Sequence, residues 1–204
     1  MSDGTIAGKE VKKFVLGVDL DGVVSDFVAD VRPHAAEWFG VPIEELTANP
    51  DYNFSQWGHG MPQKYPYLHE FAVVQRGLFI NSKPMAGAPQ ALRNLSDAGV
   101  HIRIITSRIC ISGHHAEIVK QTVDWLEKHG IPYWDLCFMK DKLSVNADLY
   151  IDDAPSNILK FKKFQRNVLI FKTSVNTGVD GEGADNWTDM EKLVLKARDA
   201  YGTF

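Results

Sequence analysis

Four short apolar runs recur along the chain, and stretches with helical periodicity separate them. They cover residues 14–18, 101–105, 148–151 and 168–171, and a shorter run covers residues 136–138. Continuous apolar runs of this length are typical of strands that are buried on both faces, as in a parallel sheet. This alternation constrains the fold more than any other feature. It predicts an α/β fold in which helices flank a mainly parallel sheet.

Helices are predicted between the runs at residues 88–98, 115–129, 155–163 and 187–201. Gly99 and Gly130 mark the ends of the first two helices, because glycine readily adopts the left-handed conformation that terminates a helix. Asp153 is the expected N-cap of the third helix and Thr188 that of the fourth. Residues 178–185 are rich in glycine and acidic residues, and we expect them to form a surface loop.

Residues 25–84 interrupt the alternation. This stretch is too long for an ordinary crossover between parallel strands and shows helical rather than strand patterns. We expect a helical insertion above the sheet, with residues 14–24 and 85–204 forming the core and residues 1–13 a flexible leader. The insertion is rich in aromatic residues, which are Phe27, Trp38, Phe39, Tyr52, Phe54, Trp57, Tyr65, Tyr67, Phe71 and Phe79.

The composition narrows the class of protein further. The chain has 204 residues, of which 45% are hydrophobic and 24% charged, as expected for one globular domain with a small insertion. Its net charge of −4 disfavours a nucleic-acid polymer as the main partner, because that role needs a basic face. No apolar run approaches the roughly 20 residues needed to cross a bilayer, and the first residues lack a signal-peptide pattern, so we expect a cytoplasmic protein without a membrane partner.

Polar residues follow three of the predicted strands at the point where each strand ends. They are Asp19 and Asp21 after the first strand, Thr106 and Ser107 after the second, and Asp152 and Asp153 after the third. Ligands of open parallel sheets bind beyond the carboxyl ends of the strands. Four carboxylates gathered there repel one another unless a hard divalent cation such as Mg²⁺ lies among them. The hydroxyls suit phosphate oxygens, and Lys142 offers a positive charge. The alternative is that Asp19 and Asp153 are only helix caps or turn residues.

The order of these residues resembles the four motifs of the haloacid dehalogenase-like (HAD) phosphohydrolases. The motifs are DLDGV at residues 19–23, the Thr106–Ser107 pair, Lys142, and IDDAP at residues 151–155. Within that superfamily the chain most resembles the 5'(3')-deoxyribonucleotidases. This closer resemblance rests on DLDGVVSDF, on GLF followed by KPMAGAPQAL, on SVNADLYIDDAPSNI and on the late Asn186–Trp187. It implies a Rossmann-like core with a small helical cap inserted after the first strand.

The resemblance also implies a role for each matching carboxylate. Asp19 would be the nucleophile that forms an aspartyl-phosphate, and Asp21 would protonate the leaving oxygen and then deprotonate the attacking water. Mg²⁺ would be held by the Asp19 carboxylate, the main-chain carbonyl of Asp21 and Asp153. Asp152 would be a water-mediated partner, although which member of this adjacent pair binds the metal directly stays open at this point.

The remaining site residues would bind the substrate. Thr106, Ser107 and Lys142 would hold the phosphoryl oxygens, with Lys140 as a competitor of Lys142. Arg108 departs from the family pattern, which often has proline there, so either it adds a phosphate contact or the following loop takes another path. Phe27 matches a position that stacks on the nucleobase, and we expect Trp57, which lies next to Gly58 and Gly60, to be a second stacking candidate. Most of the other aromatic residues of the insertion are expected to form its own core.

These inferences predict a Mg²⁺-dependent phosphoric monoester hydrolase that acts on a (deoxy)nucleoside monophosphate through an aspartyl-phosphate. A phosphatase for a sugar phosphate or another small ester would keep the same four motifs. Dehalogenation has no use for Asp21 or Mg²⁺, and a non-catalytic binding protein on this fold should have lost Asp19, Asp21 or Lys142. Family members are often dimers, so the resemblance implies a homodimer as well.

Overall fold

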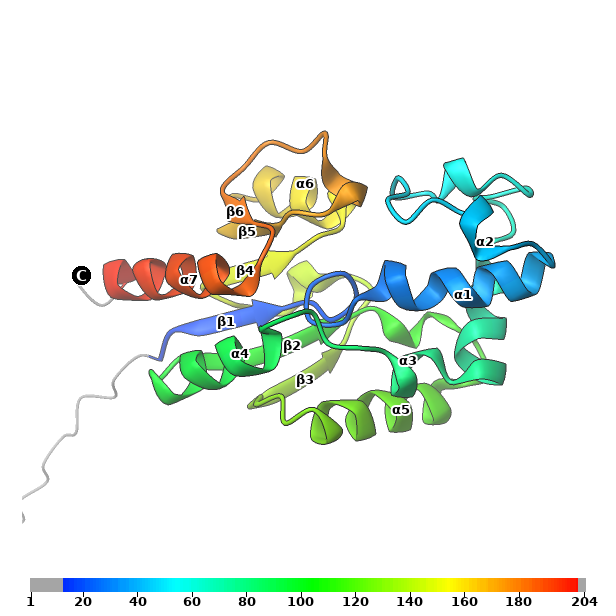
Figure 1. Ribbon diagram of the computed structural model, residues 1–204. Coiled ribbons are helices and arrows are strands. Elements are labelled where there is room, and N and C mark those ends of the chain that lie inside the picture. Colours follow the sequence, from blue (N-terminus) through cyan, green and yellow to red (C-terminus); the bar gives the residue numbers. More distant parts are fainter. Residues whose placement is uncertain (1–12, 202–204) are drawn as a thin grey trace, which may run out of the picture.

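A six-stranded parallel sheet forms the centre of the computed structural model, which describes residues 13–201 (Figure 1). The strand order is β3-β2-β1-β4-β5-β6, and every neighbouring pair is parallel. The strands are β1 (Val15–Val18), β2 (His101–Thr106), β3 (Asp135–Phe138), β4 (Leu149–Asp152), β5 (Val168–Phe171) and β6 (Gly183–Ala184). The predicted α/β class with a parallel sheet is therefore confirmed, and each predicted apolar run lies in a strand.

Helices cover both faces of this sheet. The α-helices are α1 (Phe27–Phe39), α2 (Tyr65–Glu70), α3 (Leu78–Asn81), α4 (Ala88–Asp97), α5 (His115–Lys128), α6 (Pro155–Lys163) and α7 (Trp187–Tyr201). Buried side chains of α4, α5 and α7 form one hydrophobic cluster with β1 and β2. A smaller cluster, in which Phe161 of α6 stacks on Tyr150 of β4, covers the opposite face. Short 3₁₀ turns occur at Ile43–Glu45, Ser55–Trp57, Arg108–Cys110, Lys142–Ser144 and Ser174–Asn176.

Three local predictions were wrong. Residues 178–185 are not all loop, because Gly183–Ala184 forms the edge strand β6. A Cβ at Gly183 would lie 1.9 Å from the carbonyl oxygen of Ile170, so this close pairing requires glycine. A two-residue strand without an apolar run leaves no periodic signal in the sequence.

The other two errors concern helix caps. The N-cap of α6 is Ala154, which provides no side-chain cap, and not Asp153. At α7 the capping side chain is that of Asn186, whose Oδ1 accepts the amide of Asp189 at 2.9 Å, and not that of Thr188. The observed cap lies one residue from the predicted one at α6 and two residues from it at α7, and sequence patterns discriminate poorly over such short distances.

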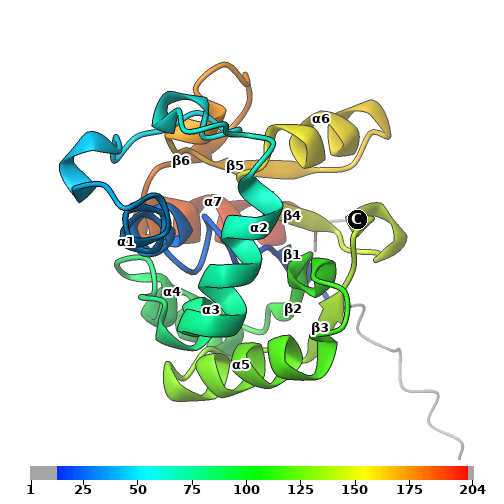
Figure 2. The ribbon, with the colours of Figure 1, turned by 90° about the vertical axis from the view of Figure 1, so that its right-hand side faces the viewer.

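The chain leaves the core after β1 and returns to it at nearly the same place. The amide of Asp26 donates to the carbonyl of Lys83 at 2.9 Å, and that of Met85 donates to Val24 at 2.8 Å. Between these points lie α1, α2, a π-helical turn (Phe71–Gln75) and α3. Figures 1 and 2 show α1 and α2 beyond the carboxyl ends of the strands. These contacts suit the predicted insertion at 25–84, although the division into core and insertion stays a prediction.

The buried cluster of this segment, which includes Leu46, Trp57 and Phe79, also takes in Ile111 and Ile118 from the core side. Residues 1–12 of the predicted leader lie outside the described residues. Within residues 13–201, no helix combines the length and the apolar character that a membrane span requires.

Candidate active site

The central strand β1 brings the predicted site residues together. It pairs with β2 on one side and with β4 on the other, so Val18 lies beside both Ile104 and Ile151. Because all three strands run in the same direction, the residues that follow them converge at one edge of the sheet. The amide of Asp19 continues the ladder by donating to the carbonyl of Ile151 at 3.1 Å.

Lys142 lies between two of the carboxylates. Its Nζ is 2.6 Å from Oδ2 of Asp19 and 2.7 Å from Oδ2 of Asp152, and all three side chains are buried. Asp152 also accepts hydrogen bonds from the Asn157 side chain at 3.1 Å and from the amide of Ala154 at 3.0 Å. Lys140, the competing candidate, is exposed.

Asp153 completes an acidic cluster. Ligand oxygens of Asp19, Asp152 and Asp153 all lie within 4.8 Å of one another. Within residues 13–201, no hydrogen bond or ion pair to the Asp153 carboxylate is seen. Its main-chain carbonyl is fixed by the Asn176 side-chain amide at 2.8 Å. At Gly22, which has a φ of +79°, a Cβ would lie only 2.0 Å from Oδ2 of Asp153. The turn after β1 therefore packs directly against this carboxylate.

Burial and mutual repulsion disfavour the charged forms of this cluster. Burial raises the pKa of Asp19 to about 7; Lys142 opposes that rise, and the charges of Asp152 and Asp21 add to it. Burial, with the charges of Asp19 and Asp152, also raises the pKa of Asp153 well above its ordinary value. One lysine thus compensates three buried carboxylates incompletely. An all-oxygen cluster with excess negative charge fits a hard divalent cation such as Mg²⁺.

Asp21 has a different partner. Arg108 donates to its Oδ1 through Nη2 at 2.7 Å, and Nε of Arg108 lies 3.1 Å from Oδ1 and 3.0 Å from Oδ2. Although burial opposes it, this guanidinium lowers the pKa of Asp21. The Arg108 side chain is fully buried, whereas 26% of the Asp21 side chain is exposed. This pairing disfavours the phosphate contact that the sequence suggested for Arg108.

The two hydroxyl residues follow β2 as predicted, but their environments differ. Thr106 is buried, and its Oγ1 accepts the amide of Arg108 at 3.3 Å. Ser107 is exposed. Both residues therefore lie at the carboxyl edge of the sheet, with Thr106 buried and Ser107 exposed to solvent.

Aromatic side chains of the inserted segment gather around His69. The half-buried ring of Phe27, the first residue of α1, meets the imidazole edge-on at a centroid distance of 6.0 Å, and Tyr65 stacks on it at 5.4 Å. Trp57 has only 2% of its surface exposed, packs against Phe54 with the ring centroids 4.6 Å apart and the planes tilted by 43°, and donates its indole N–H to the carbonyl of Thr47 at 2.9 Å. This packing disfavours the stacking role predicted for Trp57.

The chain matches a known family of nucleotidases over nearly its whole length. The family model described as 5' nucleotidase, deoxy (pyrimidine), cytosolic type C protein matches residues 13–200. The chain belongs to this nucleotidase family. It is 46% identical, over 88% of its length and 89% of the relative's, to a Chlorobaculum tepidum protein provisionally named 5'(3')-deoxyribonucleotidase. It is 30% identical to the human cytosolic-type 5'(3')-deoxyribonucleotidase over 67% of this chain and 68% of the human one.

Solved structures share the fold of this nucleotidase at low identity. A HAD-superfamily hydrolase of subfamily IA from Geobacter sulfurreducens has a TM-score of 0.53 at 11% identity, covering 91% of this chain and 99% of that one. A defluorinating L-2-haloacid dehalogenase has a TM-score of 0.54 at 8% identity, covering 90% and 96%. Together with the family match, these findings make the chain a HAD phosphohydrolase close to the deoxyribonucleotidases, and hence a phosphoric monoester hydrolase.

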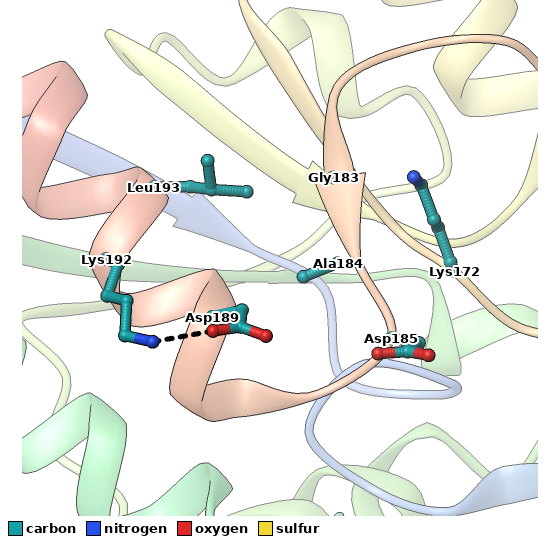
Figure 3. Close-up of a pocket in the computed structure, with 7 residues that line it drawn as sticks. All are labelled: Lys172, Gly183, Ala184, Asp185, Asp189, Lys192 and Leu193. Atoms are coloured by element: carbon teal, nitrogen blue, oxygen red, sulfur yellow. Dashed lines mark hydrogen bonds and ion pairs between the residues drawn. The ribbon is translucent and has the colours of Figure 1, made fainter.

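The nucleotidase also has a hollow of about 430 Å³ between β6 and the start of α7 (Figure 3). Its lining residues are Lys172, Gly183, Ala184, Asp185, Asp189, Lys192 and Leu193. Asp189 and Lys192 form an ion pair of 2.7 Å there. None of the predicted site residues lines this hollow, and we assign it no part in the reaction.

Sequence reasoning missed several residues that shape the site. Ser25 and Asn157 lie within the quoted motifs, and their contacts to Asp21 and Asp152 could have been anticipated from that proximity. Asn176 and His69 carry no such signal, because each is far from the site residues in sequence. Only the folded chain places Asn176 against the main chain of Asp153.

Proposed function

We propose that this nucleotidase hydrolyses a deoxynucleoside monophosphate in a Mg²⁺-dependent reaction through an aspartyl-phosphate on Asp19. The observation that carries the proposal is the cluster of three buried carboxylates within 4.8 Å of one another, with Lys142 bonded to two of them. A phosphate dianion can approach such a cluster only when positive charge offsets the repulsion. The family match supports the nucleotidase class, and the metal and the intermediate are our inference.

The acidic cluster suggests which groups would hold the metal. Asp19, Asp153 and the main-chain carbonyl of Asp21 would be the ligands. Asp152 already accepts bonds from Lys142, Asn157 and Ala154, which supports Asp153, whose carboxylate has no hydrogen-bond or ion-pair partner within the described part of the chain, as the direct ligand. When bound, Mg²⁺ would neutralise the carboxylates and polarise a phosphoryl oxygen.

The protein's own residues would carry out two phosphoryl transfers and the two proton transfers that accompany them. The carboxylate of Asp19, oriented by the amide of Leu20 at 2.8 Å from Oδ1, would attack phosphorus in line. The ester P–O bond would break as Asp21 protonates the departing oxygen, and Asp21 would later take a proton from the water that attacks the phosphorus of the aspartyl-phosphate. Lys142, Thr106 and Ser107 would bind the phosphoryl oxygens throughout.

The inserted segment would supply the nucleoside subsite. Phe27 follows the turn that contains Asp21 and keeps a half-exposed ring, which is suited to stacking on a base. The substrate would then be a small phosphate ester and not a nucleic-acid polymer, which the net charge of −4 disfavours. A cytoplasmic location remains an expectation from the sequence pattern, and a homodimer remains one from the family resemblance.

Phosphate release from a panel of substrates tests this function. The panel contains 5' and 3' deoxynucleotides, ribonucleotides and sugar phosphates, each with Mg²⁺ or with EDTA. We expect deoxynucleotides to be preferred, EDTA to abolish turnover, and Asp19→Asn to lower kcat by on the order of 10³-fold or more, as expected for loss of a nucleophile. Asp148→Asn is the matched control, because Asp148 accepts the amide of Val15, the first residue of β1, and is not in the acidic cluster.

Metal-independent turnover, or full activity in Asp19→Asn, would contradict the mechanism. A preference for sugar phosphates over every nucleotide would overturn the substrate and leave the mechanism intact.

A further inference from the structure

Arg108 contacts the two carboxylate oxygens of Asp21 unequally. Oδ1 accepts Nη2 at 2.7 Å, Nε at 3.1 Å and the hydroxyl of Ser25 at 3.1 Å. Among residues 13–201, Oδ2 accepts a single hydrogen bond, from Nε at 3.0 Å. Nη2 also donates to the hydroxyl of Ser25 at 3.2 Å, which closes a small ring of hydrogen bonds around Oδ1. The carboxylate is therefore held mainly through Oδ1, which has three contacts, whereas Oδ2 has one contact and keeps a lone pair available for another partner.

The guanidinium itself is fixed from the opposite side. It lies over the ring of Phe79 at 4.2 Å and faces Trp125 at 5.6 Å. Its Nη1 is buried and has no hydrogen-bond partner in the described structure. Leaving a buried donor of a charged group unpaired is costly. Stability alone would favour an apolar side chain here, so the arginine is better explained by what it does to Asp21.

We propose that Arg108 is a positioning residue that clamps Asp21 through Oδ1 and so leaves Oδ2 as the oxygen that exchanges the proton with the leaving group. This inference rests on the proposed function, in which Asp21 is the acid and base. As the Asp19–phosphorus bond forms and the ester bond breaks, the proton on Oδ2 passes to the departing alkoxide. In the second half-reaction Oδ2 receives a proton from the attacking water, which restores the starting state.

The dependence of the rate on the leaving group tests the role of Arg108. A nucleoside alkoxide needs protonation, whereas p-nitrophenolate leaves without it. We expect Arg108→Met to lower kcat/KM for a deoxynucleoside monophosphate by about 100-fold, the scale of a lost general acid, and that for p-nitrophenyl phosphate by no more than about fivefold. The parameter kcat/KM is chosen because it reports the steps up to departure of the leaving group and excludes hydrolysis of the intermediate.

A double variant shows whether the effect runs through Asp21. If Arg108 acts only by positioning that carboxyl, Arg108→Met should cost nothing further in an Asp21→Asn background. Ser25→Ala keeps the buried guanidinium but removes one contact to Oδ1 and the hydroxyl that accepts from Nη2. We expect it to lower kcat/KM for the nucleotide several-fold more than for p-nitrophenyl phosphate, in keeping with the loss of these two hydrogen bonds. Arg108→Lys keeps the positive charge but lacks the planar guanidinium with its several N–H donors. We expect an intermediate loss of kcat/KM that depends on the leaving group.

Arg103→Met is the matched control. Arg103 lies in β2 and is paired with Asp135, and the effect of losing that pair on kcat/KM should not depend on the leaving group.

Equal losses of kcat/KM on both substrates, a change confined to KM, or additive losses in the Asp21→Asn background would overturn the inference. If Arg108→Met does not fold in a thermal melt, Ser25→Ala and Arg108→Lys decide by the same criteria. Failure of the proposed function is distinct, because it appears as undiminished activity in Asp19→Asn before any Arg108 variant is compared.

Discussion

At Gly22 the backbone approaches Asp153 so closely that no side chain fits between them. A Cβ would lie 2.0 Å from the Oδ2 atom, and the φ of +79° is itself unfavourable for other residues. We expect Gly22→Ala to displace the carboxylate and lower phosphate release at least ~10-fold, the scale of a disturbed metal environment. Gly99→Ala is the control, since Gly99 has a φ of +86° but no atom within 4 Å of the added Cβ. It should cost about 1 kcal/mol of stability and leave activity unchanged. Equal activity in both variants would contradict this account.

His69 makes the stability of the protein depend on pH. Burial lowers its pKa to about 4; the charge of Asp21 opposes this, and that of Arg108 adds to it. The unfolded chain therefore binds the proton more tightly, so stability is unaffected above the ordinary value of about 6.5 and falls as the pH drops toward 4. At pH 5 this group should cost on the order of 2 kcal/mol.

Urea unfolding at pH 7.5 and pH 5 measures this dependence. His69→Gln should remove that part of the pH dependence, whereas His59→Gln, at an exposed position, should retain it. If the unaltered protein and both variants lose the same free energy of unfolding between pH 7.5 and pH 5, His69 is not the responsible group.

At the scale of elements, the start of α7 depends on one side chain. Asn186 Oδ1 caps the amide of Asp189, and its carbonyl accepts the amide of Met190 at 3.1 Å. We expect Asn186→Ala to lower the free energy of unfolding by about 1 kcal/mol. Thr188 lies inside the first turn, so Thr188→Ala should change the free energy of unfolding by only about 0.3 kcal/mol. Thermal or urea unfolding gives both values. A larger loss in Thr188→Ala would restore the N-cap that the sequence suggested.

At the scale of the whole molecule, the acidic cluster joins the ends of β1 and β4, so its occupation should stabilise the entire fold. A ligand that binds only the native state at a concentration 100 times its Kd adds about 2.7 kcal/mol. We therefore expect saturating Mg²⁺ to raise Tm by roughly 5 °C or more for a domain of this size. Asp153→Asn should lose the shift and Asp148→Asn should keep it. An undiminished shift in Asp153→Asn would exclude Asp153 from the site.

Local patterns predicted much of the fold. The five apolar runs correspond to β1–β5, and the helices α6 and α7 begin and end at the predicted residues. Each of these elements has its own periodicity or its own glycine and proline signals. The strand β6 has neither, because its pairing depends on the close approach of Gly183 to Ile170. The N-caps of α6 and α7 were misplaced by one and two residues, because local sequence patterns do not separate positions this close to a helix start.

The sequence by itself determined the strands, the helices between them and the presence of carboxylates and hydroxyls at the strand ends, because these depend on residues close together in the chain. Only the tertiary structure decided that β1 lies between β2 and β4, which is what brings Asp19 within reach of Lys142 and Asp152. It also decided that Arg108 pairs with Asp21 and that Trp57 is buried. Contacts of this kind join residues tens of positions apart, and their geometry is set by how the helices and strands pack rather than by any local pattern.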